Sequence, residues 1–466
     1  MSRHIVTFTT PGGYYVYDRE INSLLSTNET EYTAFQRIEN NKDKPDDWKL
    51  LKKYTERGYL KESLLKEIEH PATQFMKFNL ACNVAQITIQ VTQNCLLRCK
   101  YCTYSGNYDN NRTHSNKSMS LDMMKKCIDF LMSRSKNVKE LYVSFYGGEA
   151  LIELDKIKEC VQYIKESYKG RTVRYILTTN GTMFDDDSIK FLEDMNFDVS
   201  VSIDGPKVYH DLNRVFPDGT GSYDKIMTSL SYIKNNYPKF FEKISFLTTV
   251  APGVDFACVD EFFSTNELLA DSVVTQNTVN SYNAIDSVVY DDLYNIHYNF
   301  QNMKVMLSAL GLYSKDKISK LFTAELAEID RMYADLSEVI ITEKTHPSGP
   351  CLPGIVRPFV SVDGSIFPCE RVGEESEAVK IGHIDTGFDM DQINKVLNIG
   401  LLTEKECKTC WNFLHCGLCA VSCDGVTALS RQMRLEKCNS TKNDTLYLLK
   451  AICLLLENGY RFDNRM

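Results

Sequence analysis

The sequence lacks a long apolar run, and no stretch approaches the roughly 20 residues that a membrane-spanning helix needs. Its start, Met1-Ser-Arg-His-Ile-Val-Thr-Phe, holds no apolar segment like that of a signal peptide. A basic excess is also absent, because 53 Lys and Arg stand against 62 Asp and Glu. Nucleic-acid-binding proteins usually carry a basic stripe that meets phosphates. These absences predict a cytoplasmic protein that binds neither membrane nor nucleic acid.

Cysteine, by contrast, is plentiful, with 16 in 466 residues. Cytosolic thiols stay reduced, so clustered cysteines indicate metal rather than disulfides. Eleven of them lie in clusters or motifs. The other five are scattered and are expected to be small core residues; they are Cys82, Cys127, Cys160, Cys258 and Cys453. The length predicts about three domains.

One short stretch, Cys95-Leu-Leu-Arg-Cys99-Lys-Tyr-Cys102, organises the rest of the chain. A strand-like run from Gln86 leads into it. Three thiolates on one loop can hold three irons of a four-iron cubane and leave the fourth iron free to bind something else. The alternatives are a disulfide loop or a structural zinc site, for which His114 is the only close fourth ligand.

From residue 86 to about 280, strand and helix patterns alternate. Strands are expected at 86–92, 140–146, 172–179, 198–203, 244–250 and 272–277, with helices such as 120–134 and 155–168 between them. Such alternation predicts an α/β fold with a parallel sheet covered by helices. Six units form a partial (β/α)6 barrel, and ligands in such folds gather at the carboxyl ends of the strands.

Polar and glycine-rich motifs follow successive strands of this pattern. The second strand ends in Gly147-Gly148-Glu149, the third in Thr179-Asn180-Gly181, and the fourth in Ser202-Ile-Asp204-Gly205. Glycines allow close backbone approach, and a glutamate accepts from an ammonium group. Arg214 suits a carboxylate by bidentate geometry. Taken singly, the third and fourth motifs are also ordinary turns.

Together with C-x3-C-x2-C, these motifs resemble the radical S-adenosylmethionine (radical SAM) enzymes. The resemblance implies a [4Fe–4S] cluster on Cys95, Cys99 and Cys102, whose fourth iron takes the amino and carboxylate groups of S-adenosylmethionine. An electron, from a donor such as flavodoxin or ferredoxin, then yields a 5′-deoxyadenosyl radical. The residues that it implies for cofactor binding are Tyr101, Gly147, Gly148, Glu149, Thr179, Asn180, Ser202, Asp204, Arg214 and Val250. Val250 is equally well explained as barrel core.

Eight further cysteines lie between residues 351 and 438: Cys351, Cys369, Cys407, Cys410, Cys416, Cys419, Cys423 and Cys438. Their pattern resembles the SPASM extension of radical SAM peptide maturases, which implies two auxiliary [4Fe–4S] clusters and three clusters in all. Eight thiolates suffice for two such clusters. A pair of zinc knuckles is the alternative by spacing alone.

The resemblance assigns these thiols to two sets. Cys351, Cys369 and Cys419, with Cys423 as a further candidate, are implied for the first auxiliary cluster. Cys407, Cys410, Cys416 and Cys438 are implied for the second. The sequence departs from the family because no cysteine follows Cys351 closely and the ligand from the Cys419–Cys423 segment is ambiguous. Either both cysteines serve the first cluster, or that cluster keeps an open iron that could bind a substrate thiolate.

Residues 1–85 form a small unit by pattern: strands from Ile5 and Tyr14, a helix capped at Asn28, a second helix from Pro45, and a short strand at Tyr59-Leu60. This order resembles a winged-helix-like recognition element for a precursor peptide, which binds a leader by adding a strand to a sheet edge. A plain structural cap is the alternative. We therefore expect domains at 1–85, 86–340 (barrel and a helical linker) and 341–466 (SPASM).

The family resemblance also suggests a reaction. SPASM enzymes form thioether links, carbon–carbon crosslinks, or formylglycine in sulfatases. In sulfatase-maturing members an aspartate follows the cysteine equivalent to Cys369, whereas here Glu370 stands, a candidate base or an exposed partner of Arg371. We therefore expect a maturase like those of sactipeptides and ranthipeptides, which forms cysteine thioethers in a ribosomal precursor peptide. A non-catalytic iron–sulfur electron carrier and a zinc-dependent winged-helix regulator are alternatives from other classes.

Overall fold

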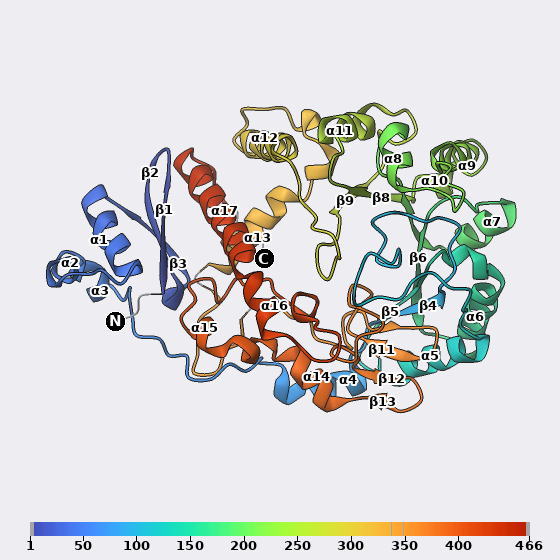
Figure 1. The fold of residues 1–466 in the computed structure, drawn as a ribbon, viewed down its shortest axis with the longest axis horizontal. Helices are drawn as coiled ribbons and strands as arrows, with labels where there is room; N and C mark the ends of the chain where they lie inside the picture. The colour runs from blue at the N-terminus through green and yellow to red at the C-terminus, as the bar shows by residue number, and fades with distance from the viewer. Residues whose placement is uncertain (1–3, 337, 348, 463–466) are drawn as a thin grey trace.

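A computed structural model describes residues 4–336, 338–347 and 349–462. Its largest element is one ten-stranded sheet with the order β13-β12-β11-β10-β4-β5-β6-β7-β8-β9. A separate three-stranded sheet, β1-β2-β3, lies at the opposite end of the molecule (Figure 1). The long helix α17 (Cys438–Glu457) lies beside this small sheet and packs on β1.

Six parallel strands form the barrel part of the large sheet. They are β4 (Gln86–Thr92), β5 (Glu140–Gly147), β6 (Thr172–Thr179), β7 (Asp198–Ser202), β8 (Ser245–Val250) and β9 (Val274–Thr278). Each pairs in parallel with its neighbour, which confirms the α/β alternation predicted from the sequence. Because all six run the same way, their carboxyl ends meet at one edge of the sheet.

Amphipathic helices cover the outside of these strands: α5 (Leu121–Ser133), α6 (Leu154–Ser167), α7 (Asp186–Asp194), α8 (Lys207–Asn213), α9 (Tyr223–Asn236), α10 (Pro238–Phe241) and α11 (Phe256–Thr265). Their apolar stripes and the strands share one hydrophobic core. Ser120 caps α5 by accepting from the Met123 N–H. The preceding helix α4 (Met76–Cys82) buries Met76 and Leu80 in the same core, although the expected domain boundary lies after it.

The N-terminal unit consists of β1 (Ile5–Thr10), β2 (Gly13–Asp18), β3 (Ser23–Thr27), α1 (Glu29–Glu39), α2 (Pro45–Leu50) and α3 (Lys52–Glu56). Asn28 and Glu31 form a capping box on α1, as the sequence indicates. The strand expected at Tyr59-Leu60 is wrong, because no strand forms there. The third strand is β3 instead, which pairs antiparallel with β2.

The C-terminal region extends the barrel sheet rather than standing apart from it. Its strands are β10 (Phe359–Val360), β11 (Ser365–Phe367), β12 (Gly382–His383) and β13 (Gly387–Phe388). β10 pairs in parallel with β4, so the region is joined directly to the strand that leads into Cys95. Its helices are α14 (Met390–Leu397), α15 (Glu404–Lys408), α16 (Arg431–Glu436) and α17.

Two helices link the barrel to this region, α12 (Asp292–Ala309) and α13 (Glu325–Asp335). A 3-10 turn at Lys320–Phe322 precedes the second helix. Among the scattered cysteines, Cys127, Cys160 and Cys453 are buried as predicted, while Cys82 and Cys258 are half-buried.

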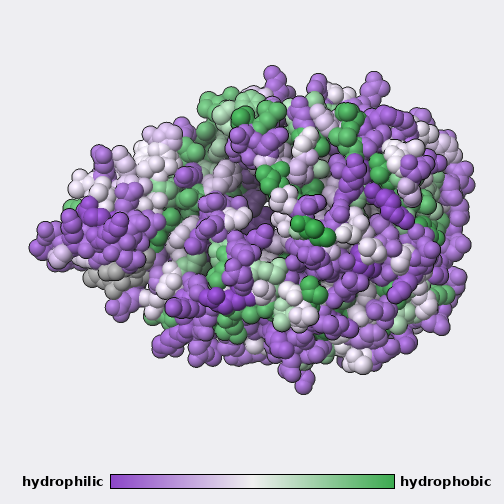
Figure 2. All heavy atoms as spheres, viewed as in Figure 1, coloured by the Kyte–Doolittle hydropathy of each residue, from purple (hydrophilic) through white to green (hydrophobic). Residues whose placement is uncertain are grey.

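The surface is mainly hydrophilic on the face that Figure 2 shows, with scattered apolar patches and a recess near its middle. Across the part of the chain that the structure describes, no helix combines the length and the apolar character needed to cross a membrane.

Candidate active site

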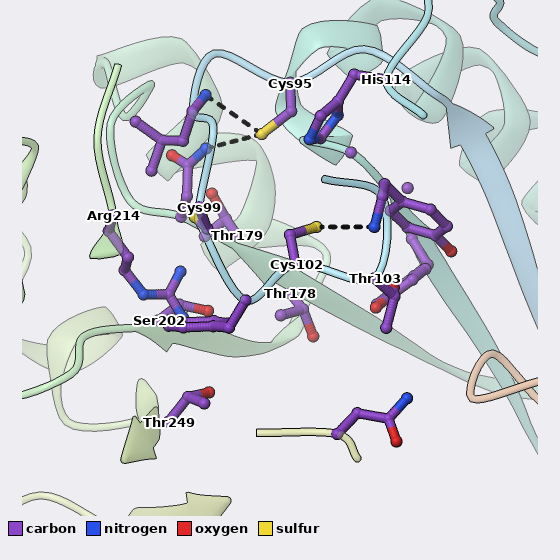
Figure 3. Close-up of a pocket in the computed structure, with 18 of the residues that line it drawn as sticks. Cys95, Cys99, Cys102, Thr103, His114, Thr178, Thr179, Ser202, Arg214 and Thr249 are labelled. Carbon is purple, nitrogen blue, oxygen red and sulfur yellow. Dashed lines mark hydrogen bonds between the residues drawn. The ribbon is translucent and has the colours of Figure 1, made fainter. Parts of the chain in front are cut away.

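The three cysteines of the C-x3-C-x2-C motif lie on the loop that follows β4. Backbone and side-chain N–H groups point at their sulfurs: Leu97 N lies 3.4 Å and Asn180 Nδ2 3.7 Å from the Cys95 sulfur, and Tyr104 N lies 3.4 Å from that of Cys102. Figure 3 shows Cys95, Cys99 and Cys102 around one space. The loop therefore presents three thiols to a common cavity at the carboxyl edge of the sheet.

Two glycines at the end of β5 allow this loop to lie where it does. A Cβ at Gly147 would stand 2.3 Å from the Thr92 carbonyl oxygen, and one at Gly148 would stand 2.1 Å from the Asn94 carbonyl oxygen. Both distances are far below van der Waals contact. The two glycines thus allow the end of β5 to pack closely against the backbone that enters the cysteine loop. The sequence pattern did not reveal this role.

A cavity of about 300 Å³ opens among the cysteines and the strand ends. Most of the expected cofactor-binding residues line it: Tyr101, Gly147, Gly148, Thr179, Asn180, Ser202 and Arg214. These residues come from the ends of three successive strands, β5, β6 and β7, and from the loops after β4 and α8. Convergence at the carboxyl edge is the arrangement expected of a parallel α/β sheet.

Three expected residues, Glu149, Asp204 and Val250, stand behind this lining. Glu149 is 1% exposed and accepts hydrogen bonds from Thr179 Oγ1 and Asn180 N, both at 2.7 Å. Its oxygens are therefore already engaged, and they hold the end of β6 beside the cysteine loop. Burial raises the pKa of this carboxyl.

Asp204 connects two of the lining residues. Its carboxylate accepts from the Tyr101 hydroxyl and from Thr249 N, and it lies 3.0 Å from Arg214 Nε. The Arg214 guanidinium also lies 5.6 Å from the centre of the Tyr101 ring. Arg214, expected as a clamp for a cofactor carboxylate, thus pairs with Asp204 and still lines the cavity.

Val250 is fully buried in the barrel core, and the neighbouring Thr249 lines the cavity. Alternation along a strand explains this, since successive side chains point to opposite faces. The sequence analysis also missed further lining residues: Leu97, Thr103, Tyr104, His114, Tyr146, Thr178, Thr278, Val279 and Asn280. Their only sequence signal is their position just after a predicted strand or beside the cysteine motif.

The thiols of this loop fit an iron–sulfur cluster chemically. Burial raises the pKa of Cys95 and of Cys99 to about 11, although the positive charge of Arg214 favours the Cys99 thiolate. Buried thiols stay protonated at neutral pH unless a cation replaces the proton, and iron supplies that charge. Three thiols on one loop, N–H groups aimed at two of the sulfurs and an adjoining cavity suit a three-ligand cluster with a small molecule beside it.

A second set of thiols gathers in the C-terminal region. Cys407, Cys410, Cys416 and Cys438 line one cavity of about 290 Å³. A charge on Cys407 raises the pKa values of the other three, which shows that the four thiols are neighbours. The structure therefore brings together the four cysteines that the sequence resemblance grouped.

The remaining C-terminal cysteines divide unequally. Cys419 is electrostatically coupled to both Cys351 and Cys369. Cys423 is fully buried, and its thiol donates toward the Cys419 and Ala420 carbonyls. Burial raises the pKa of Cys423 to about 12. Cys423 also lies near Cys419, whose charge contributes to its raised pKa, but its thiol is hydrogen-bonded to its own backbone turn.

Glu370 lies beside Cys369, 3.2 Å from Arg357 and not paired with Arg371 as the alternative had it. One of its oxygens, Oε2, is buried and has no hydrogen-bond partner. Its negative charge contributes to the raised pKa of Tyr146, which lines the active-site cavity. The charge of Glu370 therefore acts on both Tyr146 and Cys369.

The N-terminal unit is docked on the loop of the second thiol set. Arg19 is fully buried, and its Nη1 donates to the Lys408 carbonyl at 2.8 Å and the Cys410 carbonyl at 3.1 Å. Asn22 Oδ1 lies 2.8 Å from His415 Nε2 on the same loop. The unit is thus joined to the C-terminal region by buried polar contacts, which the sequence analysis did not foresee.

No three His, Cys, Asp or Glu side chains of the described residues are arranged to hold a single metal ion. A four-iron cubane is wider than one ion, so its ligands lie farther apart than those of zinc.

Comparison with known proteins identifies residues 89–265 as matching the radical SAM superfamily. The chain is 25% identical over 333 residues to a cysteine-type anaerobic sulfatase-maturating enzyme of Clostridium novyi (strain NT), covering 68% of this chain and 83% of that one. It is 24% identical over 256 residues to the radical SAM cyclopropyl synthase TigE of Paramaledivibacter caminithermalis, covering 50% and 52%.

The fold is similar to that of a solved structure, native anSMEcpe with bound AdoMet and Cp18Cys peptide. The TM-score is 0.56 at 19% identity, and the match covers 81% of this chain and 99% of that one. Membership of the superfamily implies a [4Fe–4S] cluster and S-adenosylmethionine as cofactors. The chain thus contains a radical SAM domain at residues 89–265 and is homologous to the anaerobic sulfatase-maturating enzymes.

Proposed function

We propose that this enzyme forms cysteine thioether crosslinks in a ribosomally synthesised, cysteine-rich precursor peptide. The observation that carries the proposal is the group of Cys351, Cys369 and Cys419 next to Glu370, with the Cys423 thiol hydrogen-bonded to its own backbone turn. Three protein thiolates on a [4Fe–4S] cluster leave one iron for an outside ligand. The thiolate of a substrate cysteine is the ligand that such an iron prefers.

Cys95, Cys99 and Cys102 would hold the radical SAM cluster, and the lining residues Gly148, Ser202 and Arg214 would orient S-adenosylmethionine. Together these groups supply, when bound, a 5′-deoxyadenosyl radical that removes a hydrogen atom from an unactivated carbon. The chain's own contribution is to hold the target carbon at this cavity and to exclude water. Buried Glu149 and Asp204 keep the lining residues in place, with Asp204 bound to Tyr101 and Thr249.

Glu370 is the proposed base for the substrate thiol. A thioether link requires the cysteine to lose its proton, and an unpartnered carboxylate oxygen can accept it. Glu370 Oε2 is buried and free of hydrogen bonds, while Arg357 holds the other end of the carboxylate. Its position next to Cys369 would place the base beside the iron that binds the substrate thiolate.

Cys407, Cys410, Cys416 and Cys438 would hold a second auxiliary cluster, which makes three clusters in the chain. With four protein ligands this cluster has no open iron, so its contribution would be electron transfer. Flavodoxin or ferredoxin is the proposed electron donor, as in the sequence analysis.

The N-terminal unit is the proposed binding site for the leader of the precursor. Within the described residues, β3 pairs only with β2, so its other edge carries unpaired backbone groups. An extended peptide can add there as a further strand. The recess near the middle of the face in Figure 2 lies between this unit and the barrel, on the route that the core peptide would take.

The relatives support action on a peptide in general. The similar solved structure carries a bound Cp18Cys peptide, and TigE is named as a cyclopropyl synthase. Formylglycine formation in a sulfatase is the second candidate, which the relationship to cysteine-type anaerobic sulfatase-maturating enzymes favours. The glutamate in place of aspartate after Cys369 argues for the thioether reaction instead.

The decisive experiment uses reconstituted enzyme, reductant, S-adenosylmethionine and a cysteine-rich peptide encoded beside the gene. We expect each link to remove the mass of two hydrogen atoms and to protect one thiol from alkylation. A parallel reaction with a sulfatase-derived cysteine peptide tests formylglycine formation. The matched control is Glu370→Gln, which keeps the size of the side chain but cannot accept the proton. Cleavage of S-adenosylmethionine without any modified peptide would refute the proposal.

Metal analysis separates the remaining classes. Three clusters predict about twelve irons per chain, and a zinc-dependent regulator predicts zinc instead. A non-catalytic electron carrier would hold iron but would not bind S-adenosylmethionine tightly, which equilibrium dialysis measures directly.

A further inference from the structure

His114 is a buried imidazole that the reaction described above leaves unused. It lines the same cavity as Cys95, Cys99 and Cys102. Both of its ring nitrogens are buried, and neither has a hydrogen-bond partner. In Figure 3 the ring extends toward the space between Cys95 and Cys102. Buried polar atoms are almost always paired, so two unpaired nitrogens facing one cavity indicate a partner that belongs to the bound state.

The surroundings of His114 restrict what that partner can be. Burial, together with the nearby positive charges of Arg98 and Arg112, lowers the pKa of the ring to about 4. In either protonation state an imidazole carries at least one N–H donor. The Gln93 carbonyl lies near the ring but makes no hydrogen bond of good geometry with either nitrogen, so the N–H is not committed to it and is available to an acceptor in the cavity.

His114 is not one of the cavity residues expected to bind S-adenosylmethionine. The residues suited to the polar parts of S-adenosylmethionine, including Ser202 and Arg214, come from β7 and the loop after α8. His114 instead stands with Thr103 and Tyr104, immediately after the cysteine motif. Tyr104 N already points at the Cys102 sulfur, and its ring centre lies 6.4 Å from that of His114. The side chain thus belongs with the cysteine loop.

We propose that His114 donates a hydrogen bond to the sulfur atoms of the cluster held by Cys95, Cys99 and Cys102, and thereby raises its reduction potential. Hydrogen bonds to cluster sulfurs stabilise the reduced, more negative state. Leu97 N, Asn180 Nδ2 and Tyr104 N point at these sulfurs from backbone and amide groups. His114 adds a donor on a side chain, which substitution can remove. It is a positioning residue that acts through the cluster.

This inference rests on the cofactors of the superfamily and not on the proposed peptide chemistry, so its test uses no peptide. Full-length enzyme is reconstituted with iron and sulfide, and the cluster is titrated under EPR. The radical SAM signal is the one that S-adenosylmethionine alters. A Cys95→Ala/Cys99→Ala/Cys102→Ala variant provides the spectrum of any other cluster for subtraction.

His114→Phe keeps a ring of similar size and has no donor. We expect a reduction equilibrium at least tenfold less favourable, which is 59 mV for a one-electron couple. His114→Gln retains an N–H group and should recover at least half of that shift. An unchanged potential in His114→Phe with full iron content would overturn the inference. A second result would also overturn the inference: an EPR signal that S-adenosylmethionine does not alter in the wild-type enzyme but does alter in His114→Phe. His114 would then be the fourth iron ligand.

If His114→Phe fails to retain iron, His114→Ala supplies a second test. Added imidazole can occupy the space of the missing ring and offer the same donor. Recovery of the potential on adding imidazole supports the inference, and indifference to imidazole contradicts it. Loss of peptide modification alone bears on the proposed function and leaves this comparison unaffected.

Discussion

The two cysteine regions of this molecule rest on different supports. The Cys95–Cys102 loop leaves a strand in the middle of a ten-stranded sheet, and its neighbours are the ends of parallel strands. The C-terminal thiols lie on loops and short helices, held by isolated buried groups such as Arg19 and Arg434. Residues at the ends of strands are held in place by the hydrogen bonds of the sheet. Residues on loops are held in place only by the individual contacts that those loops make.

The buried arginines show what that dependence means. Arg434 is 1% exposed, donates to Thr403 Oγ1 at 3.1 Å, and favours the thiolate forms of Cys416 and Cys438. One cation therefore serves both the backbone arrangement and the charge of the ligands. In the sheet-based site these tasks are divided between the strands and Arg214.

The largest expected difference between the regions is in S-adenosylmethionine cleavage. Cys99→Ala should abolish formation of 5′-deoxyadenosine, because the cofactor has no cluster beside it. Cys416→Ala should leave this cleavage intact and remove only the iron of the second auxiliary set, about four atoms per chain. Chromatography of the nucleoside and iron analysis measure the two effects. Equal loss of cleavage in both variants would show that the regions do not act separately.

Glycine-to-alanine substitutions compare the closely packed backbone at the Cys95–Cys102 loop with the open loop at Gly417. Gly148→Ala would place a Cβ 2.1 Å from the Asn94 carbonyl oxygen, so the cysteine loop must move. We expect loss of the radical SAM cluster and a lower melting temperature. Gly417→Ala is the matched control in the other region, since its nearest neighbour is Thr441 Oγ1 at 3.9 Å. A Gly148→Ala enzyme with normal iron content would contradict the packing argument.

Arg19→Met tests whether the N-terminal unit supports the second thiol set. It leaves the carbonyls of Lys408 and Cys410 without their donor, at a cost of about 1–3 kcal/mol for each buried group. Arg37→Met is the control, because its pair with Asp47 is partly exposed, and solvent screening leaves such surface pairs with little effect on stability. Urea unfolding measures both variants. Equal stability of the two would argue that the docking is incidental.

The smallest predicted effect concerns the metal-free protein. The pKa of Cys95 and of Cys99 is raised to about 11, so little thiolate exists at pH 8 and alkylation there should be slow. Their reaction with iodoacetamide should accelerate as the pH rises from 8 to 11. Exposed Cys351 serves as the reference for accessibility. Peptide mass spectrometry follows each site, and a flat pH profile at Cys95 would contradict the assigned burial.

Much of the fold followed from pattern. The alternation of strands and helices predicted six parallel strands, and the observed bounds of β4 and β6 match the predicted ranges. The sequence did not predict the short strands, because a strand of a few residues is too short to show an alternating pattern. β3 has only five residues and was missed, and β10 has only two, so its pairing with β4 carried no sequence signal.

The sequence predicted which residues belong to the candidate site, but not which of them line the cavity and which lie buried behind the lining. The motifs named residues at the correct strand ends, yet they could not separate cavity wall from support. Glu149 and Asp204 lie behind the wall because each is occupied by neighbouring donors, and Val250 faces the core because its strand alternates. His114 was noted only as a candidate zinc ligand, since a lone histidine has no pattern around it.

The order of residues by itself determined the three-cysteine motif and the alternating strands, because spacing along the chain sets which ligands a short loop can present. The grouping of the C-terminal thiols came from the family resemblance and not from their spacing. The tertiary structure decided which side chains reach the cavity, where the N-terminal unit docks, and that Cys423 turns away from Cys419's partners. These depend on contacts between residues far apart in the chain, and such contacts arise only when the core closes and buried polar groups find partners.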